Sequence, residues 1–475
     1  MSTSSRLARN VLVLGVSQVV SLALGFVLWV HLGRALGAER LGMLAFGMAL
    51  AAYFVLLVAL GFDQVGVREI ARDSGREAEI VPHLVGIRLV LGALATAAFV
   101  GLALVLDLEG VYQTVVVVMA GLVVARAVQL DWVYQAREQM QVGAVRNAAA
   151  VAVTAGIALG LVRGPEDLVT AAVAVAAGPV VANLGLAAYY ALEVGVPRPR
   201  FERAAWLALA APAVPLAAST LVSQVYYNAD KLMLEAFRTT AEVGLYEAAY
   251  KMYSLGIAPA AVLSVAFFPV LSGALGKDGA VRREGRRYGE ALLSLGPPLC
   301  LAGVVLAPGV LEVVFGAEYL PATPAFRILL GYAGLVYLSM TFGTALMAWN
   351  AEKSYFKAVL GGGIANVILN LALIAPLGPT GAAWATLLSE AVVMVGMAVR
   401  YRRLTGTLHA DMIARAGVVA VAGGLVPALA GVALGLPLAA SIALVLAATA
   451  VAIRLSGLAA PKDLVAVLLR RPVAP

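Results

Sequence analysis

Charged side chains, cysteine and histidine are scarce in this sequence of 475 residues. Only 13% of the residues are charged, and the chain contains one cysteine, Cys300, and three histidines. A single cysteine cannot form an internal disulfide bond, and it offers no thiol cluster to a metal ion. Ordinary soluble domains are about 25% charged. The scarcity of charge therefore excludes an ordinary water-soluble globular protein. The sequence predicts neither a metal site nor a disulfide scaffold.

Long apolar runs take the place of the missing charge. Hydrophobic residues make up 62% of the chain, and runs long enough to cross about 30 Å of hydrocarbon recur along it. The uncharged runs are Val11–Val30, Leu41–Phe62, Leu168–Leu192, Ala204–Ala229, Met252–Gly276, Ala291–Leu311, Ile328–Ala351 and Ala358–Gly381. Spans with one or two charges fill the gaps, at Leu84–Leu106, Val111–Leu130, Ala144–Val162 and Ala382–Val399. Gly435-Leu436-Pro437 divides the uncharged stretch Ala416–Ile453 into two. The sequence predicts an all-α membrane protein with about fourteen transmembrane helices, the first of which is not a cleavable signal peptide.

The basic residues predict how these helices are oriented. With the N-terminus in the cytoplasm, 25 of the 34 Lys and Arg residues fall in cytoplasmic stretches and 4 in outside loops. This bias fits the positive-inside rule, so we expect a multi-pass protein of a bacterial or archaeal cytoplasmic (inner) membrane with both termini cytoplasmic. The net charge of +7 then reflects contact with anionic membrane lipids. Nucleic acid is not an expected partner, because no loop is long enough to form a binding domain.

Two weak internal matches indicate a repeated architecture. Leu32–Gly42 resembles Leu234–Gly244, and Gln135–Glu138 resembles Asn350–Lys353. Each pair falls at equivalent places in six-span blocks of the same orientation, which is typical of parallel repeats in transporters. We expect an N-lobe with its basic linker over residues 1–203, a C-lobe over 204–403, and a final helix pair with a cytoplasmic tail over 404–475. Two such six-helix lobes would enclose a central cavity.

Three stretches resemble a known family. They are Leu32–Gly42, Asn228–Leu234 followed by Val243–Lys251, and Gly378–Ala383 leading to Leu388–Glu390. The chain is similar along its whole length to the polysaccharide (O-antigen, Wzx-type) flippases of the multidrug/oligosaccharidyl-lipid/polysaccharide exporter superfamily. The resemblance implies movement of a polyprenyl-diphosphate-linked saccharide from the inner to the outer leaflet by alternating access. It also implies glycosyltransferases and a polysaccharide polymerase as partners, and no cofactor.

Two other activities of that superfamily stay open. Lipid II flippases typically carry arginines in the first span, where this chain has Ser17 and Gln18 and no charge. Cation-coupled multidrug or metabolite antiporters commonly carry a carboxylate there, which this chain also lacks. An enzyme is not expected, because the outside loops are too short to hold catalytic groups. An ATP-driven pump is not expected either, because no Gly-x-x-x-x-Gly-Lys-Ser/Thr motif occurs.

Charges within the spans are the candidate site residues, since each costs about 2.5–3.5 kcal/mol to insert. A diphosphate headgroup needs cationic and polar partners, so the cavity candidates are Lys251, Arg88, Arg126, Arg327, Gln18, Tyr250 and Asn228. The alternative for Lys251 is a structural pair with Glu247, and the alternative for the arginines is snorkelling to the headgroups. The candidates for ion coupling or gating are Glu390, Glu247, Asp230 and Lys231. Glu390 near mid-span could equally be a protonated packing residue, while Asp63 and Asp131 are expected at the membrane interface.

Overall fold

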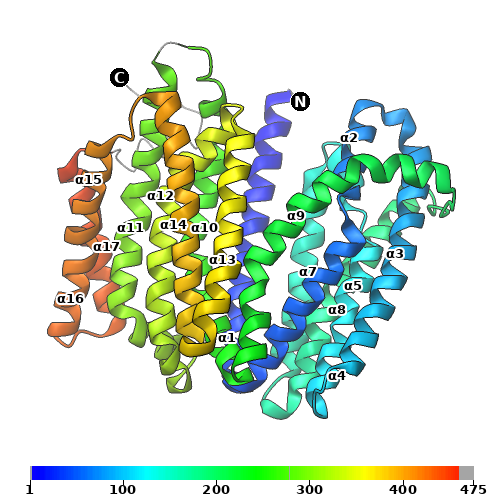
Figure 1. Ribbon diagram of the computed structural model, residues 1–475, viewed down its shortest axis with the longest axis horizontal. Coiled ribbons are helices and arrows are strands. Elements are labelled where there is room, and N and C mark those ends of the chain that lie inside the picture. The colour runs from blue at the N-terminus through cyan, green and yellow to red at the C-terminus, as the bar shows by residue number, and fades with distance from the viewer. Residues whose placement is uncertain (1–2, 278, 459–475) are drawn as a thin grey trace. The chain divides into compact units, whose positions relative to one another are not determined.

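The computed structural model describes residues 3–277 and 279–458, and within these ranges it describes only the backbone of residues 3–19, 215, 216, 218, 219, 222, 223 and 225–227. This part of the chain contains helices and no strand (Figure 1). The longer helices are α1 (Thr3–Ala59), α3 (Glu77–Val105), α7 (Met140–Leu161), α8 (Leu168–Glu193), α9 (Arg203–Phe237), α10 (Thr240–Ser272), α11 (Ala280–Val314), α12 (Thr323–Ala348), α13 (Glu352–Leu377), α14 (Pro379–Thr405) and α17 (Leu438–Ser456). The shorter elements are α2 (Phe62–Arg72), η1 (Ser74–Arg76), α4 (Val111–Val118), α5 (Ala120–Ala127), α6 (Asp131–Ala136), η2 (Pro165–Asp167), η3 (Ala317–Ala322), α15 (Ala410–Val419), η4 (Ala420–Leu425) and α16 (Val426–Ala433).

The predicted class of a many-span α-helical membrane protein is confirmed. Twelve helical segments of the described residues are long and apolar enough to cross a membrane, and one of them, Val20–Arg72, contains the end of the first predicted span and the whole of the second. These two spans meet at Gly37, where the backbone of α1 is not helical (φ 76°, ψ 171°). Glycine adopts this positive φ readily because it has no Cβ atom. Helix α9 is not among the twelve. If α1 is counted as two crossings and α9 is added to the twelve segments, the total is the predicted fourteen transmembrane helices.

Several predicted spans differ from the structure in detail. The span predicted over Ala358–Gly381 crosses the turn at Gly378, because α13 ends at Leu377 and α14 begins at Pro379. The fourth, expected to be one helix over Val111–Leu130, is divided at Met119 into α4 and α5 and already ends at Ala127. The second, expected to reach Phe62, ends at Ala59, and the chain turns at Leu60 and Gly61, which both have positive φ. The predicted division of the last apolar stretch is confirmed, because α16 ends at Ala433 and α17 begins at Leu438.

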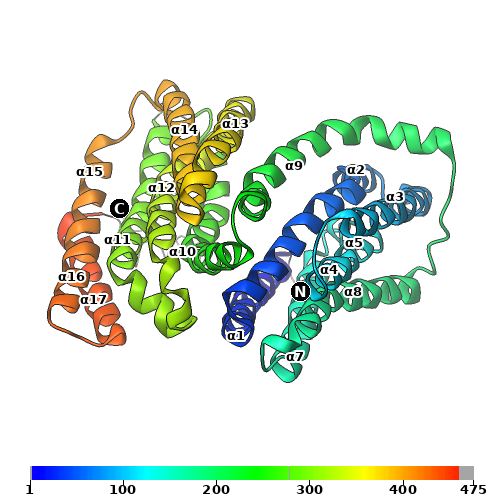
Figure 2. The ribbon, with the colours of Figure 1, turned by 60° about the horizontal axis from the view of Figure 1, so that its bottom comes forward.

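The chain forms two compact units. Unit 1 contains the residues up to Glu235 together with Thr239–Gly244, and unit 2 contains Ala236–Arg238 and the residues from Leu245 onward. In unit 1, α1 packs against α7, α5 and α3, and α7 packs along α8. In unit 2, α14 packs along α13 and α12, and the last helices α15 to α17 pack against α11 (Figures 1 and 2). The proposed bounds of the sequence repeats, 1–203 and 204–403, stay a prediction.

The first turn of α10 belongs to unit 1 and lies directly against α1. A Cβ atom on Gly42 would overlap the carbonyl oxygen of Thr240, and a Cβ atom on Gly244 would overlap that of Ala38. The contact is reciprocal, because the offset of 202 residues between the two matched motifs relates Gly42 to Gly244 and Ala38 to Thr240. The glycine that ends each motif therefore lets two helix backbones touch.

Candidate functional site

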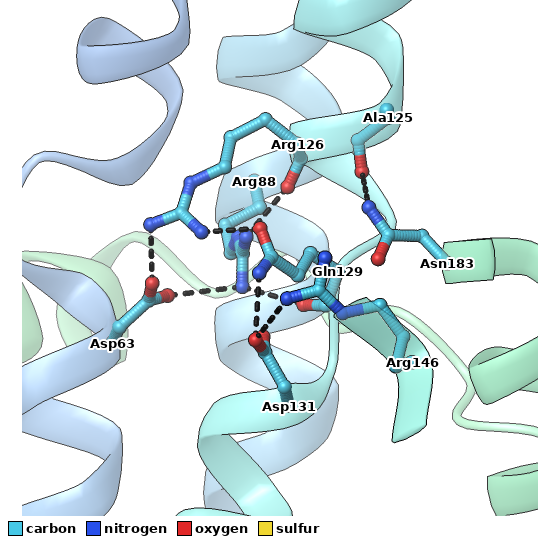
Figure 3. A network of polar contacts seen from close by, with 8 residues as sticks. All are labelled: Asp63, Arg88, Ala125, Arg126, Gln129, Asp131, Arg146 and Asn183. Atoms are coloured by element: carbon cyan, nitrogen blue, oxygen red, sulfur yellow. Dashed lines mark hydrogen bonds and ion pairs between the residues drawn. The ribbon is translucent and has the colours of Figure 1, made fainter. Parts of the chain in front are cut away.

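Two helix breaks in unit 1 bring a set of polar side chains together. The turn at Leu60 and Gly61 places Asp63 in the first turn of α2, and the end of α5 at Ala127 is followed by Gln129 and Asp131. Arg88 approaches from α3 and Arg146 from α7. Figure 3 shows these side chains pointing toward one another around the end of α5. We name Asp63, Arg88, Arg126, Gln129, Asp131 and Arg146 the arginine network.

Arg88 is the buried centre of the arginine network. Its side chain is only 1% exposed, and its Nη1 lies 3.0 Å from Oδ1 of Asp63. The same guanidinium donates to two backbone carbonyls, of Gln129 at 2.7 Å and of Arg126 at 2.5 Å. The last carbonyls of a helix have no partner within the helix, so Arg88 closes the end of α5 inside the unit. The main structural role of Arg88 is therefore to donate hydrogen bonds to the backbone carbonyls at the end of α5.

Arg126 and Arg146 form the more accessible part of the arginine network. Arg126 pairs with Asp63 and donates to the side-chain oxygen of Gln129. Gln129 Nε2 and Arg146 Nη2 each donate to Oδ2 of Asp131 at 2.8 Å. The exposed fractions of the Arg126 and Arg146 side chains are 21% and 16%. Three guanidinium groups face two carboxylates, so the network carries a formal excess of one positive charge that an anion could neutralise.

A second polar cluster of unit 1 has the opposite charge balance. Arg137 pairs with Glu77 at 2.5 Å and with Glu193 at 3.0 Å, and it lies over the rings of Tyr134 and Tyr190 at 5.3 and 5.6 Å. The hydroxyl of Tyr134 donates to Glu193, and that of Tyr190 donates to Glu77. One cation here faces two carboxylates, so the cluster has no spare positive charge. It ties α3, α6 and α8 together.

We therefore expect Arg137→Ala to affect stability and not transport. Loss of two ion pairs and the contact with two aromatic rings is expected to lower the free energy of unfolding by about 2 kcal/mol. Thermal unfolding of the purified protein in detergent measures the first effect. Transport per folded molecule in liposomes should stay at the wild-type rate, and a loss there would place Arg137 in the transport site.

Lys251 and Glu247 form an ion pair in unit 2. Nζ of Lys251 lies 3.2 Å from Oε1 of Glu247, one helical turn earlier on α10. The Lys251 side chain is 27% exposed and that of Glu247 is 2% exposed. The predicted pairing is thus present, and the ammonium group stays accessible. Tyr250 lies beside this pair in an aromatic row that links Tyr246, Tyr253 and Tyr332, with ring centroids 4.8 to 6.2 Å apart.

The other sequence-predicted residues lie elsewhere in the two units. Asp230 and Lys231 are buried on α9, and Asn228 donates to the side chain of Gln224 at 2.8 Å. Arg327 on α12 donates to the carbonyl of Val304 at 3.0 Å. Glu390 on α14 is 8% exposed, next to Ser389, which accepts a hydrogen bond from Asn366. The side chain of Gln18 lies outside the described residues.

Sequence reasoning missed part of the arginine network. Arg88 and Arg126 were predicted separately, whereas the structure joins them through Asp63. Asp63 and Asp131, expected as interfacial residues, pair with arginines in the structure, and Arg146, at the edge of the predicted span Ala144–Val162, was not among the candidate site residues. The available signal was that both carboxylates lie at the ends of apolar runs, within reach of arginines on neighbouring spans.

Comparison with known proteins adds to this geometry. Residues 7–274 match the model of a family described as polysaccharide biosynthesis protein. A probable low-salt glycan biosynthesis flippase, Agl15 of Haloferax volcanii, is 28% identical over 176 residues, which is 37% of this chain and 37% of that protein. The chain thus aligns with little more than a third of the length of this curated relative.

Solved structures share the fold at low sequence identity. The lipid II flippase MurJ in an inward closed conformation has a TM-score of 0.69 at 12% identity, over 93% of this chain and 99% of MurJ. An inward-facing multidrug resistance MATE family transporter of the MOP superfamily has a TM-score of 0.63 at 15% identity, over 82% of this chain and 94% of that transporter. These similarities show that the chain has the fold of such transporters.

Proposed function

This chain belongs to the polysaccharide biosynthesis protein family, and we propose that it is a flippase for a polyprenyl-diphosphate-linked oligosaccharide. It moves the lipid-linked saccharide from the cytoplasmic to the outer leaflet by alternating access. The similarity to Agl15, described as a glycan biosynthesis flippase, supports this substrate class. Glycosyltransferases that build the saccharide and a polymerase that uses it are the partners we propose.

The observation that carries the proposal is the positive excess of the arginine network. A membrane-spanning unit retains three arginines against two carboxylates, and two of these arginines are partly exposed. Guanidinium groups bind phosphate oxygens in a forked geometry, so Arg126 and Arg146 are the groups we propose for the diphosphate. Lys251 offers a further accessible cation in unit 2. A cation-coupled drug antiporter is expected to have fewer cationic and more acidic residues in its cavity.

The proposed direction of transport agrees with the membrane potential. We place the protein in the cytoplasmic membrane with both termini inside, on the strength of the basic-residue bias. An inside-negative potential then favours outward movement of an anion by about 2.3 kcal/mol per charge per 100 mV. Glu390 is our candidate for an additional proton or cation coupling group, because it is a carboxylate 8% exposed within a span.

Leaflet translocation of a fluorescent polyprenyl-diphosphate saccharide by purified protein in liposomes tests this function. We expect wild-type protein to translocate it and Lys251→Ala to lower the rate at least tenfold, an effect of about 1.4 kcal/mol. Lys277→Ala, which removes an exposed loop lysine, is the matched control and should keep the wild-type rate. Failure of the wild type with several saccharides and an imposed ion gradient would reject the flippase.

A double variant separates substrate binding from structural pairing at Lys251. If Lys251 only neutralises Glu247, then Glu247→Gln with Lys251→Met leaves no buried charge and should restore transport. If Lys251 binds the diphosphate, the double variant should stay as slow as Lys251→Ala. Restored transport would remove Lys251 from the proposed site.

A further inference from the structure

A pocket of about 440 Å³ lies between α13 and α14, near the start of α13 and the end of α14. Lys357, Arg400, Arg403 and Ser354 line it, and no acidic residue does. The pocket belongs entirely to unit 2. It lies at the end of the spans that the sequence predicts to be cytoplasmic. We name it the α13/α14 pocket.

The three cations of the α13/α14 pocket have no counterion within the described part of the chain. No ion pair or hydrogen bond joins the side chain of Lys357, Arg400 or Arg403 to a described residue, and Nε of Arg400 is buried. Other arginines of unit 2 are paired, such as Arg286 with both Glu290 and Asp411. Three like charges around one pocket repel one another, so the arrangement favours a bound anion.

Small and apolar residues form the rest of the α13/α14 pocket. Ala358 and Gly396 let the two helices approach closely, since a Cβ atom on Gly396 would lie 3.0 Å from that of Ala358. At Gly361 an added Cβ atom would meet only Val392, at 4.0 Å, so the groove is open there. Val392 and Val399 are 47% and 49% exposed along it. The groove thus has a cationic end at headgroup level and an apolar continuation into the span.

From this arrangement we infer that the α13/α14 pocket binds the phosphate of an anionic phospholipid, with an acyl chain along the apolar groove. Arg400 and Arg403 hold the phosphate oxygens, Lys357 adds a third positive charge, and the Ser354 hydroxyl donates a hydrogen bond. Because the pocket shares no residue with the arginine network or with Lys251, the inference does not depend on the transported substrate. It describes a lipid that occupies one leaflet beside unit 2.

Lipid titration of the full-length protein in phosphatidylcholine nanodiscs tests the inference, with dioctanoyl phosphatidylglycerol as the probe and native mass spectrometry as the readout. The variant Lys357→Gln/Arg400→Gln/Arg403→Gln should bind phosphatidylglycerol at least tenfold more weakly than the wild type. The matched control Arg282→Gln/Arg283→Gln/Arg287→Gln removes the same charge from α11 and should change binding less than twofold. Equal losses in the two triple variants would mean diffuse attraction and overturn the site.

A second variant tests the groove without changing charge. Gly361→Leu keeps all three cations and places a side chain in the open groove, so it should also weaken phosphatidylglycerol binding about tenfold while the protein stays folded. Unchanged binding would overturn the proposed place of the acyl chain.

Competition experiments test which anion the pocket binds. Competition by inorganic phosphate at the same concentration would show a site for free phosphate, and preferential competition by a short polyprenyl diphosphate would show a site for the transported lipid. Either result would overturn the phospholipid assignment.

Discussion

Replacement of Arg88 by methionine is expected to lower the free energy of unfolding on the order of 3–5 kcal/mol, as removal of one partner from a buried ion pair does. The side chain is 1% exposed and pairs with Asp63. Its loss also removes the hydrogen bond to the carbonyl of Gln129 and the shorter of the bonds to the carbonyl of Arg126, which keeps the backbone N–H of Gln129 at 3.4 Å. A buried carbonyl left without a donor costs about 1–3 kcal/mol. Denaturant unfolding in detergent, followed by tryptophan fluorescence, measures the change.

Two further variants separate the charge of Arg88 from its geometry. Arg88→Lys keeps the charge, but an ammonium group cannot donate in fork geometry to two carbonyls, so its stability should lie between wild type and Arg88→Met. Arg146→Gln removes a cation that is 16% exposed and has one ion pair, so it should lower the free energy of unfolding by about 1–3 kcal/mol, less than Arg88→Met. Translocation per folded molecule should fall at least tenfold. Wild-type stability of Arg88→Met would show that α5 does not need this cap. Equal destabilisation by Arg146→Gln would make the arginine network a structural unit only.

The fold could be predicted because membrane insertion follows composition. Apolar runs of the length of Ala358–Gly381 become spans whatever their neighbours are, since every backbone polar group must be paired within the helix. Accordingly the helix class and the break at Gly435-Leu436-Pro437 were correct. The break of the fourth span at Met119 was not predicted, because no proline or glycine marks that position.

The site could be predicted only residue by residue. A charge such as Arg88 within an apolar run is conspicuous in the sequence, but its partners are chosen by tertiary packing. Asp63 lies 25 positions before Arg88 and 63 before Arg126, and no local spacing rule connects them. By contrast, the pairing of Glu247 with Lys251 is a helical i,i+4 relation and was foreseen. Contacts within one helix are thus predictable, and contacts between helices are not.

Gly42 and Gly244 show where a sequence motif has a physical cause that the sequence alone does not reveal. Each ends one of the two matched stretches after the first helix of its block. In the structure the pair forms a single contact, in which each glycine faces the backbone of the other helix. The resemblance of the two stretches is therefore explained by the need for close approach on both sides of one crossing.

Substitution of Gly42 or Gly244 by alanine is expected to destabilise the protein by at least about 1–3 kcal/mol, the usual effect of overpacking. The added Cβ atom overlaps a backbone oxygen, of Thr240 or of Ala38 respectively. Neither atom can be moved by rotating a side chain, so α1 and the first turn of α10 must separate. Gly256→Ala on α10 is the matched control, because no atom lies within 4 Å of its added Cβ. That control should gain up to about 1 kcal/mol from helix propensity. Thermal unfolding in detergent should therefore shift in opposite directions for Gly42→Ala and Gly256→Ala, and equal shifts would mean that α1 and α10 are not in contact at this crossing in the prevailing conformation.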